Sequence, residues 1–204
     1  MGLRLIPKLK ERGHDVTVLA RQRSKGQVPH DCAMVIGDAL NSRSFADHVS
    51  AADTFLHLVG VAHPAPWKAK QFHAVDLRSV QASLAAAEAA KVAHFIYVSV
   101  AHPAPVMKAY IAVRVACESL IAESGLHATI LRPWYVVGPG HRWPLLFMPM
   151  YRLLAFLPRT RDACLRLGLL TLDHMTDALV WAVEHPADGI RILTVPEIRS
   201  VATR

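Results

Sequence analysis

The chain has 204 residues and a net charge of +7 at neutral pH; 52% of its residues are hydrophobic and 19% are charged. This length is typical of a single domain, by a prior of roughly 150 residues per domain, and it can bury a large core without disulfides. The low charge and the abundant aliphatic residues exclude a disordered chain, and the apolar excess is typical of a parallel sheet covered on both faces.

Helices and strands alternate along the chain. Two of the predicted helices, residues 3–12 and 107–124, stop just before a glycine, Gly13 and Gly125, of the kind that ends helices. The predicted elements in chain order are helix 3–12, strands 15–20, 33–36 and 54–59, helix 72–91, strand 95–99, helix 107–124, strand 128–131, helix 172–184 and strand 190–195. This alternation predicts an α/β fold with a doubly wound parallel sheet.

No apolar stretch is long enough to form an integral membrane segment. Residues 144–157 are the most apolar, but this stretch contains Arg152 and is shorter than the about 20 residues that a span needs. The N-terminus lacks the apolar core of a signal peptide. Cys32, Cys117 and Cys164 are widely spaced, and we expect reduced thiols in a cytoplasmic protein.

Positive charge is concentrated in two regions. Residues 1–30 hold seven basic residues against two acidic ones, and residues 142–166 hold five arginines against Asp162. Localised positive charge favours an anionic small molecule, such as a nucleotide cofactor, or an acidic surface. We do not expect nucleic acid as a partner, because the basic residues are not interleaved with stacking aromatic residues. The twelve histidines show no ligand spacing, so no metal site is expected.

The hexapeptide Val-Ala-His-Pro-Ala-Pro occurs twice, at residues 61–66 and 100–105. Each copy follows a predicted strand, so both copies would lie at carboxyl ends of strands, where open α/β sheets bind ligands. On this interpretation His63 and His102 lie on the rim of one cleft. The alternative is a stiff exit loop, because proline can continue neither a strand nor a helix.

Four segments match one family pattern in their order and spacing. Residues 2–21 begin with a glycine and continue as a helix and a strand; residues 37–39 read Gly-Asp-Ala, residues 130–133 Ile-Leu-Arg-Pro, and residues 137–140 Val-Gly-Pro-Gly. Together they resemble the extended and atypical short-chain dehydrogenase/reductase superfamily. The resemblance is strongest to its NAD(P)H-binding group, which includes NmrA-like proteins and nucleoside-sugar epimerases.

The resemblance implies a Rossmann-like fold. Residues 1–136 would form the dinucleotide-binding core, incomplete at its N-terminus, and residues 137–204 a small substrate-side region that completes the same domain. The residues implied to contact the cofactor are Gly2, Arg21, Arg23, Asp38, Ala39, Val59, Gly60, Val61, Arg132 and Pro133.

The first strand and the glycine-rich turn of the family have no counterpart here. Gly2 would be the last glycine of that turn, which seats the pyrophosphate on the first helix. The strands at 15–20 and 54–59 would then lose their shared neighbour, and each buried backbone group left unpaired costs about 1–3 kcal/mol. We expect either that the natural protein starts upstream of Met1, or that this chain folds poorly and binds cofactor weakly.

Ser99, Tyr110 and Arg114 lie where the family has its serine and its Tyr-xxx-Lys motif, so the resemblance implies that they are catalytic. In the family the lysine lowers the pKa of the tyrosine hydroxyl, which then works as a general acid and base. Arg114 lies on the same helical face as Tyr110 and would also stabilise tyrosinate, but its planar fork does not reproduce an ammonium group. The alternative is that Arg114 pairs with Glu118 and Tyr110 only packs.

The segment after the second strand indicates the cofactor. Arg21 and Arg23 stand where an acidic residue would bind the ribose of NAD, and arginine there suits the 2′-phosphate of NADP. We therefore expect NADP, with NAD as the alternative; a solvated basic loop would have the same composition. Asp38 would accept a hydrogen bond from the adenine amino group.

The substrate side is implied to include His102, Trp134 and Tyr135. Further aromatic and methionine residues follow and would line a pocket, a core or a subunit interface: Trp143, Phe147, Met148 and Met150. The function implied is hydride transfer between nicotinamide and a small carbonyl or alcohol substrate, by an oxidoreductase or epimerase-like enzyme. The alternative is a non-catalytic NADP(H)-binding redox sensor or accessory subunit. A homodimer is compatible with either.

Overall fold

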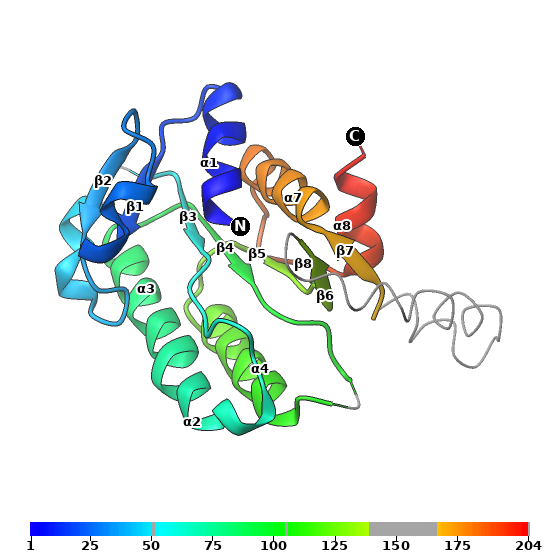
Figure 1. Cartoon of the computed structure of the whole chain (residues 1–204). Helices are drawn as coiled ribbons and strands as arrows, with labels where there is room; N and C mark the ends of the chain where they lie inside the picture. Colours follow the sequence, from blue (N-terminus) through cyan, green and yellow to red (C-terminus); the bar gives the residue numbers. More distant parts are fainter. Residues whose placement is uncertain (50–51, 105, 139–166, 204) are drawn as a thin grey trace.

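The computed structural model describes residues 1–49, 52–104, 106–138 and 167–203 (Figure 1). The strands are β1 Thr17–Ala20, β2 Ala33–Ile36, β3 Thr54–His57, β4 His94–Val98, β5 Ala128–Leu131, β6 Tyr135–Val137, β7 Leu169–Thr171 and β8 Ile190–Leu193. The α-helices longer than one turn are α1 Gly2–Glu11, α3 Arg78–Ala89, α4 Lys108–Glu123, α7 Leu172–Glu184 and α8 Val195–Val201. A short helix α2, Ala69–Gln71, and a π-helical turn, Phe72–Leu77, precede α3.

The strands form parallel sheets, as the alternation predicted. The largest has the order β3-β4-β5-β8, with Phe95 opposite both Phe55 and Ala128 in the register. β1 pairs in parallel with β2, and β6 with β7. Because parallel strands run in one direction, their carboxyl ends share one edge of a sheet, and each connection must cross back over a face. The predicted Rossmann-like α/β class is confirmed.

β1 and β3 do not pair with each other, and no strand in the described ranges lies between them. The expectation that these two strands have no common neighbour therefore agrees with the pairing. The two sheets are nevertheless joined by packing, because Leu19 of β1 and Val35 of β2 lie against the same core as Phe95.

Helices cover both faces of the central sheet (Figure 1). α3 and α4 pack on one face, around a core that includes the fully buried Phe72, Phe95 and Tyr97. On the other face the apolar sides of α1, α7 and α8 enclose a second core with Ile96 at its centre. No helix within the described ranges is long and apolar enough to cross a bilayer.

The helix ends show why the predicted boundaries hold. Gly13 has a φ of +82°, its N–H donates to the Lys10 carbonyl at 2.9 Å, and the N–H of His14 donates to the Leu9 carbonyl at 3.1 Å. These two bonds form a Schellman motif, which requires the left-handed conformation that glycine adopts at little cost.

Several elements differ from the prediction, among them α8, which was not predicted. β6 and its partner β7 were not predicted, and Val137, expected in a turn, ends β6. The last predicted strand stops at Leu193, because Thr194 and Glu197 form a capping box that starts α8. The Thr194 N–H donates to the Glu197 carboxylate at 2.6 Å, and such a box is a readable helix-start signal that the sequence interpretation overlooked.

Candidate functional site

Polar side chains gather at the carboxyl edge of the β3-β4-β5 sheet. The chain leaves β3 through Gly60 and Val61, leaves β4 through Ser99, and leaves β5 through Arg132. The implied nicotinamide-side residues therefore lie together at this edge. The implied adenine-side residues, Arg21, Arg23, Asp38 and Ala39, follow the carboxyl ends of β1 and β2.

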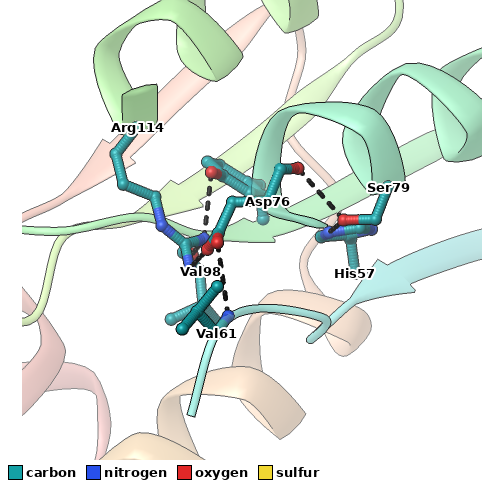
Figure 2. Close-up of polar contacts among 7 residues, drawn as sticks. His57, Val61, Asp76, Ser79, Val98 and Arg114 are labelled. Carbon is teal, nitrogen blue, oxygen red and sulfur yellow. Dashed lines mark hydrogen bonds and ion pairs between the residues drawn. The ribbon is translucent and has the colours of Figure 1, made fainter. Parts of the chain in front are cut away.

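Arg114 of α4 is held by a buried carboxylate (Figure 2). Its Nη2 forms a close ion pair with Oδ1 of Asp76, which is fully buried in the π-helical turn. Its Nη1 donates to the Tyr97 hydroxyl and to the Val98 carbonyl, both at 3.0 Å. Nε is buried without a partner in the described part of the chain. Arginine cannot be deprotonated in a protein, so this site contains a permanent cation.

Asp76 also holds the loop that leaves β3. The Val61 N–H donates to its Oδ2 at 3.3 Å (Figure 2). A Cβ on Gly60 would lie 2.6 Å from Nη2 of Arg114 and 3.0 Å from Oδ1 of Asp76, so only glycine allows the loop to pass this close to the ion pair. The Asp76–Arg114 pair thus connects the β3 exit, the π-helical turn, β4 and α4.

The environment of Tyr110 follows from this pair. Its ring packs at 5.0 Å against the Phe72 ring, and the guanidinium carbon of Arg114 lies 5.0 Å from its ring centroid. Burial raises the pKa of the Tyr110 hydroxyl; Arg114 acts in the opposite direction, and Asp76 again raises the pKa. Burial raises the pKa of the Asp76 carboxyl as well, against the opposing charge of Arg114. Tyr110 is therefore a phenol at neutral pH.

Glu118 organises the second half of the site. Its Oε1 accepts from the Ser99 hydroxyl in a short hydrogen bond and from Arg132 Nε at 3.1 Å, and its Oε2 pairs closely with Arg132 Nη2. His102 Nε2 lies 3.4 Å from the same Oε2. The alternative in which Arg114 pairs with Glu118 is wrong, because Arg114 pairs with Asp76 and Glu118 pairs with Arg132.

The N-terminus of α1 faces the end of β3. A Cβ on Gly2 would lie 3.9 Å from the Leu58 side chain. Met1 is the N-cap and no side chain caps this end, so the first N–H groups of the helix remain available to an anion.

The acidic turn after β2 is ordered by its own backbone. Asp38 Oδ1 accepts from the Leu40 N–H at 3.0 Å, while the Asp38 N–H donates to Ser44 Oγ at 2.9 Å. Arg21 and Arg23 are exposed at the end of β1. Arg21, Arg23 and Asp38 therefore lie exposed after the carboxyl ends of β1 and β2.

The remaining implied residues are placed less centrally. Trp134 is half-buried against the core under α7, and Tyr135 begins β6. His102 Nε2 lies 3.4 Å from Glu118 Oε2. The pocket residues expected beyond these, Trp143, Phe147, Met148 and Met150, lie outside the described residues.

Sequence reasoning missed Asp76 altogether. Its signal was nevertheless present: Phe72, Asp76 and Val80 follow at a spacing of four on one helical face, and all three are fully buried. An acidic residue within an apolar stripe needs a buried partner. Arg114 and Glu118 lie in the same way on the buried face of α4.

Comparisons with known proteins agree with the fold. Residues 1–140 match a family model described as NAD(P)H-binding. A search of curated proteins gave no match. Among solved structures, the UDP-glucose 4-epimerase of Thermus thermophilus in complex with NAD superposes with a TM-score of 0.69 at 16% identity, over 99% of this chain and 78% of that one.

Two further solved structures are similar. MoeE5 in complex with UDP-glucose and NAD gives a TM-score of 0.68 at 21% identity, over 99% of this chain and 77% of its own. A short-chain dehydrogenase/reductase superfamily protein from Agrobacterium tumefaciens with bound NAD gives a TM-score of 0.68 at 17% identity, over 95% of this chain and 74% of that one. At these identities the likeness shows the fold.

Proposed function

Because the chain belongs to the NAD(P)H-binding family, among Rossmann-type oxidoreductases and epimerase-like proteins, we propose that it is an NADP-dependent enzyme acting on a small carbonyl or alcohol substrate. The observation that supports this most is that Arg114 contacts both the end of β4 and the ring of Tyr110. Arg114 touches the Val98 carbonyl, just before Ser99, and lies over the ring of Tyr110.

The residues present fit most of a dinucleotide. The uncapped N–H groups of α1 would hold the pyrophosphate, and Asp38 would accept from the adenine amino group. Residues 59–61, where the chain leaves β3, would contact the dinucleotide as well. The ribose contact of the nicotinamide fits less well, because both terminal nitrogens of Arg114 are already bonded.

The preference for NADP rests on Arg21 and Arg23. Both side chains are exposed immediately after β1, where the ribose 2′ position of a bound dinucleotide would lie. Arginine matches a phosphate with two parallel hydrogen bonds, whereas a neutral 2′-hydroxyl gains little from it.

The bound nicotinamide supplies or accepts the hydride at the substrate carbon. The substrate oxygen gains a proton when the carbon gains a hydride, so carbonyl reduction needs an acid at that oxygen. Tyr110 serves this role as a half-buried phenol. Ser99 already donates its proton to Glu118, so its Oγ can accept from a substrate hydroxyl, and it orients a carbonyl oxygen only when it turns that proton away from Glu118. His102, Trp134 and Tyr135 would flank the substrate.

One observation favours the rival function, a non-catalytic NADP(H)-binding sensor or accessory subunit. Arg114 stands in the place of the family's lysine, but its guanidinium bonds Asp76 and two groups of β4. Those bonds leave it less available to a cofactor or a substrate. A chain with this arrangement could hold the cofactor and carry out no turnover.

Nicotinamide fluorescence separates the two functions. NADPH titration of the wild type, followed by a panel of small aldehydes and ketones, should show binding and then oxidation of NADPH. Tyr110→Phe should bind NADPH as the wild type does, but its turnover rate should be at least about 100-fold lower, the usual contribution of a general acid. Binding with no turnover on any substrate, unchanged in Tyr110→Phe, would favour the sensor.

A further inference from the structure

Asp76 is a buried acid that neither composition nor resemblance assigned to the site. Its two carboxylate oxygens serve different elements: Oδ1 pairs with Arg114 and Oδ2 accepts from the Val61 N–H (Figure 2). A buried charge is stable only when it is paired and hydrogen-bonded. Asp76 therefore compensates the one permanent cation that touches Tyr110 in the part of the chain that the structure describes.

We propose that Asp76 is a positioning residue for Tyr110. By holding and neutralising the Arg114 guanidinium, it extends to higher pH the range in which Tyr110 is a phenol, the form that can give up a proton to a substrate oxygen. The role of Asp76 in catalysis rests on the proposed function, because that function makes Tyr110 the proton-transfer group. The effect of Asp76 on the protonation state of Tyr110 does not depend on the proposed function.

The geometry leaves Arg114 little freedom. Its guanidinium is fixed by the Asp76 carboxylate, the Tyr97 hydroxyl and the Val98 carbonyl, and it lies between two rings, 5.6 Å from the Tyr97 centroid and 5.0 Å from that of Tyr110. Burial raises the pKa of the Tyr110 hydroxyl; the guanidinium charge lowers that pKa, and the Asp76 charge opposes the effect of the guanidinium. Without the Asp76 carboxylate, the guanidinium could turn toward a tyrosinate and stabilise it.

The other titratable groups around Tyr110 cannot replace Asp76. Tyr97 faces the pair from β4, and Cys117 from α4; burial raises the pKa of both, so both are neutral. His57 of β3, against the Tyr97 ring at 5.8 Å, is neutral too, because burial and then the Arg114 charge lower its pKa to about 3. The anionic partner of Arg114 is thus Asp76.

The test is the titration of Tyr110 itself, by NMR of tyrosine labelled with ¹³C at Cζ, with the Tyr110 signal assigned by its loss in Tyr110→Phe. We expect the wild-type pKa at or above about 10, and a fall of at least about one unit in Asp76→Asn, the effect of an uncompensated neighbouring cation. In an Arg114→Gln background the same substitution should shift the pKa by less than half as much.

Matched variants separate this role from loss of packing. Glu118→Gln removes another buried carboxylate from an arginine pair without touching Arg114, and should move the pKa of Tyr110 by less than about 0.3 unit, since no neighbouring charge within reach is altered. Asp76→Glu keeps the charge and should restore the wild-type value.

Two results would overturn the proposal. Equal shifts from Asp76→Asn with and without Arg114 would show that Asp76 does not act through Arg114. A wild-type Tyr110 that ionises below about pH 9, against an ordinary value near 10, would overturn it even if Asp76→Asn fails to fold. Neither measurement needs a substrate. A protein with no turnover would therefore contradict the proposed function and leave this result standing.

Discussion

Glu118 and Arg132 form a two-point ion pair between α4 and the segment after β5. Arg132 Nε donates to one carboxylate oxygen at 3.1 Å and Nη2 donates to the other. The pair is mostly buried, with side-chain exposures of 8% for Glu118 and 21% for Arg132. Glu118 also holds the Ser99 hydroxyl, so the same contact serves stability and the site.

This geometry predicts the cost of breaking the pair. Glu118→Ala should lower the free energy of unfolding by about 3–5 kcal/mol, because it leaves a buried arginine without its partner. Arg132→Lys keeps the positive charge but loses the two parallel hydrogen bonds of the guanidinium, and should lower the free energy of unfolding by less. The matched control is Arg12→Lys, in an exposed pair with Glu184 at 3.2 Å, where the change should stay below about 0.5 kcal/mol. Urea unfolding measures all three, and equal losses at the two arginines would contradict the interpretation.

Gly60→Ala should damage the site from the backbone side. The new Cβ would lie 2.6 Å from Arg114 Nη2, so the ion pair or the loop must shift, at about 1–3 kcal/mol of stability. Gly26→Ala is the control, because no atom lies within 4 Å of its Cβ position. Thermal unfolding of both variants tests this. A Gly60→Ala protein as stable as Gly26→Ala would show that the loop is not held against the pair.

Two buried histidines make stability depend on pH. Burial, then the charge of Arg114, lowers the pKa of His57 to about 3, and burial, then the charge of Arg191, lowers that of His94 to about 4. Both are neutral in the folded state, whereas an unfolded histidine binds a proton near pH 6.5. The unfolded state therefore binds more protons below that pH, and stability present above about pH 6.5 is lost as the pH falls toward about 4, by up to about 1.4 kcal/mol per pH unit for each histidine.

Urea unfolding between pH 7 and pH 5 tests the histidine effect. His94→Asn should reduce the pH slope by up to about 1.4 kcal/mol per unit, even if it lowers stability at pH 7 through the loss of the 3.0 Å contact with Thr129 Oγ1. His30→Asn removes an exposed histidine and should leave the slope unchanged. If the free energy of unfolding depends on pH equally in both variants, groups other than His94 cause the pH dependence.

Much of the fold could be predicted, because the signals are local. Gly13 and Gly125 end α1 and α4 where predicted, and the apolar runs at β2 and β5 have the predicted bounds. β6 and β7 could not, since residues 135–137 and 169–171 are each short and become strands only by pairing with each other across some thirty residues of chain. Local patterning carries no information about such a partner.

The site was predictable only in part. Ser99, Tyr110 and Arg114 were predicted as site residues because they stand at strand and helix positions that resemble a family motif. Asp76, from 38 residues earlier in the chain, is brought to Arg114 only by the packing of the π-helical turn against α4. Charged residues at helical spacing identify a possible neighbour on the same helix, as Glu118 is to Arg114, and cannot show that another element supplies the partner.

Cofactor preference gives a fourth prediction. Replacing Arg21 and Arg23 together by serine should weaken NADPH binding at least about tenfold, the loss of a charge-assisted contact of roughly 1.5 kcal/mol or more, and leave NADH binding unchanged. Arg12→Ser combined with Arg78→Ser removes the same two positive charges from other exposed positions and controls for net charge. Fluorescence titration at fixed ionic strength measures the ratio of the two dissociation constants. An unchanged ratio would assign these arginines to a solvated basic loop.

The pH dependence of turnover gives the last prediction. Burial raises the pKa of Tyr110 above its ordinary value, so the phenol persists into the alkaline range. Carbonyl reduction needs that phenol as the acid, and its kcat/KM should stay level from about pH 6 to at least about pH 9, then fall tenfold per unit above the pKa of Tyr110. The kcat/KM of alcohol oxidation needs the tyrosinate and should rise tenfold per pH unit over the same interval.

Asp76→Asn should move both pH profiles to lower pH, whereas Glu118→Gln should change their height without moving them. A reductive profile that falls already between about pH 6 and 8, in the wild type, would assign the proton to a group other than Tyr110.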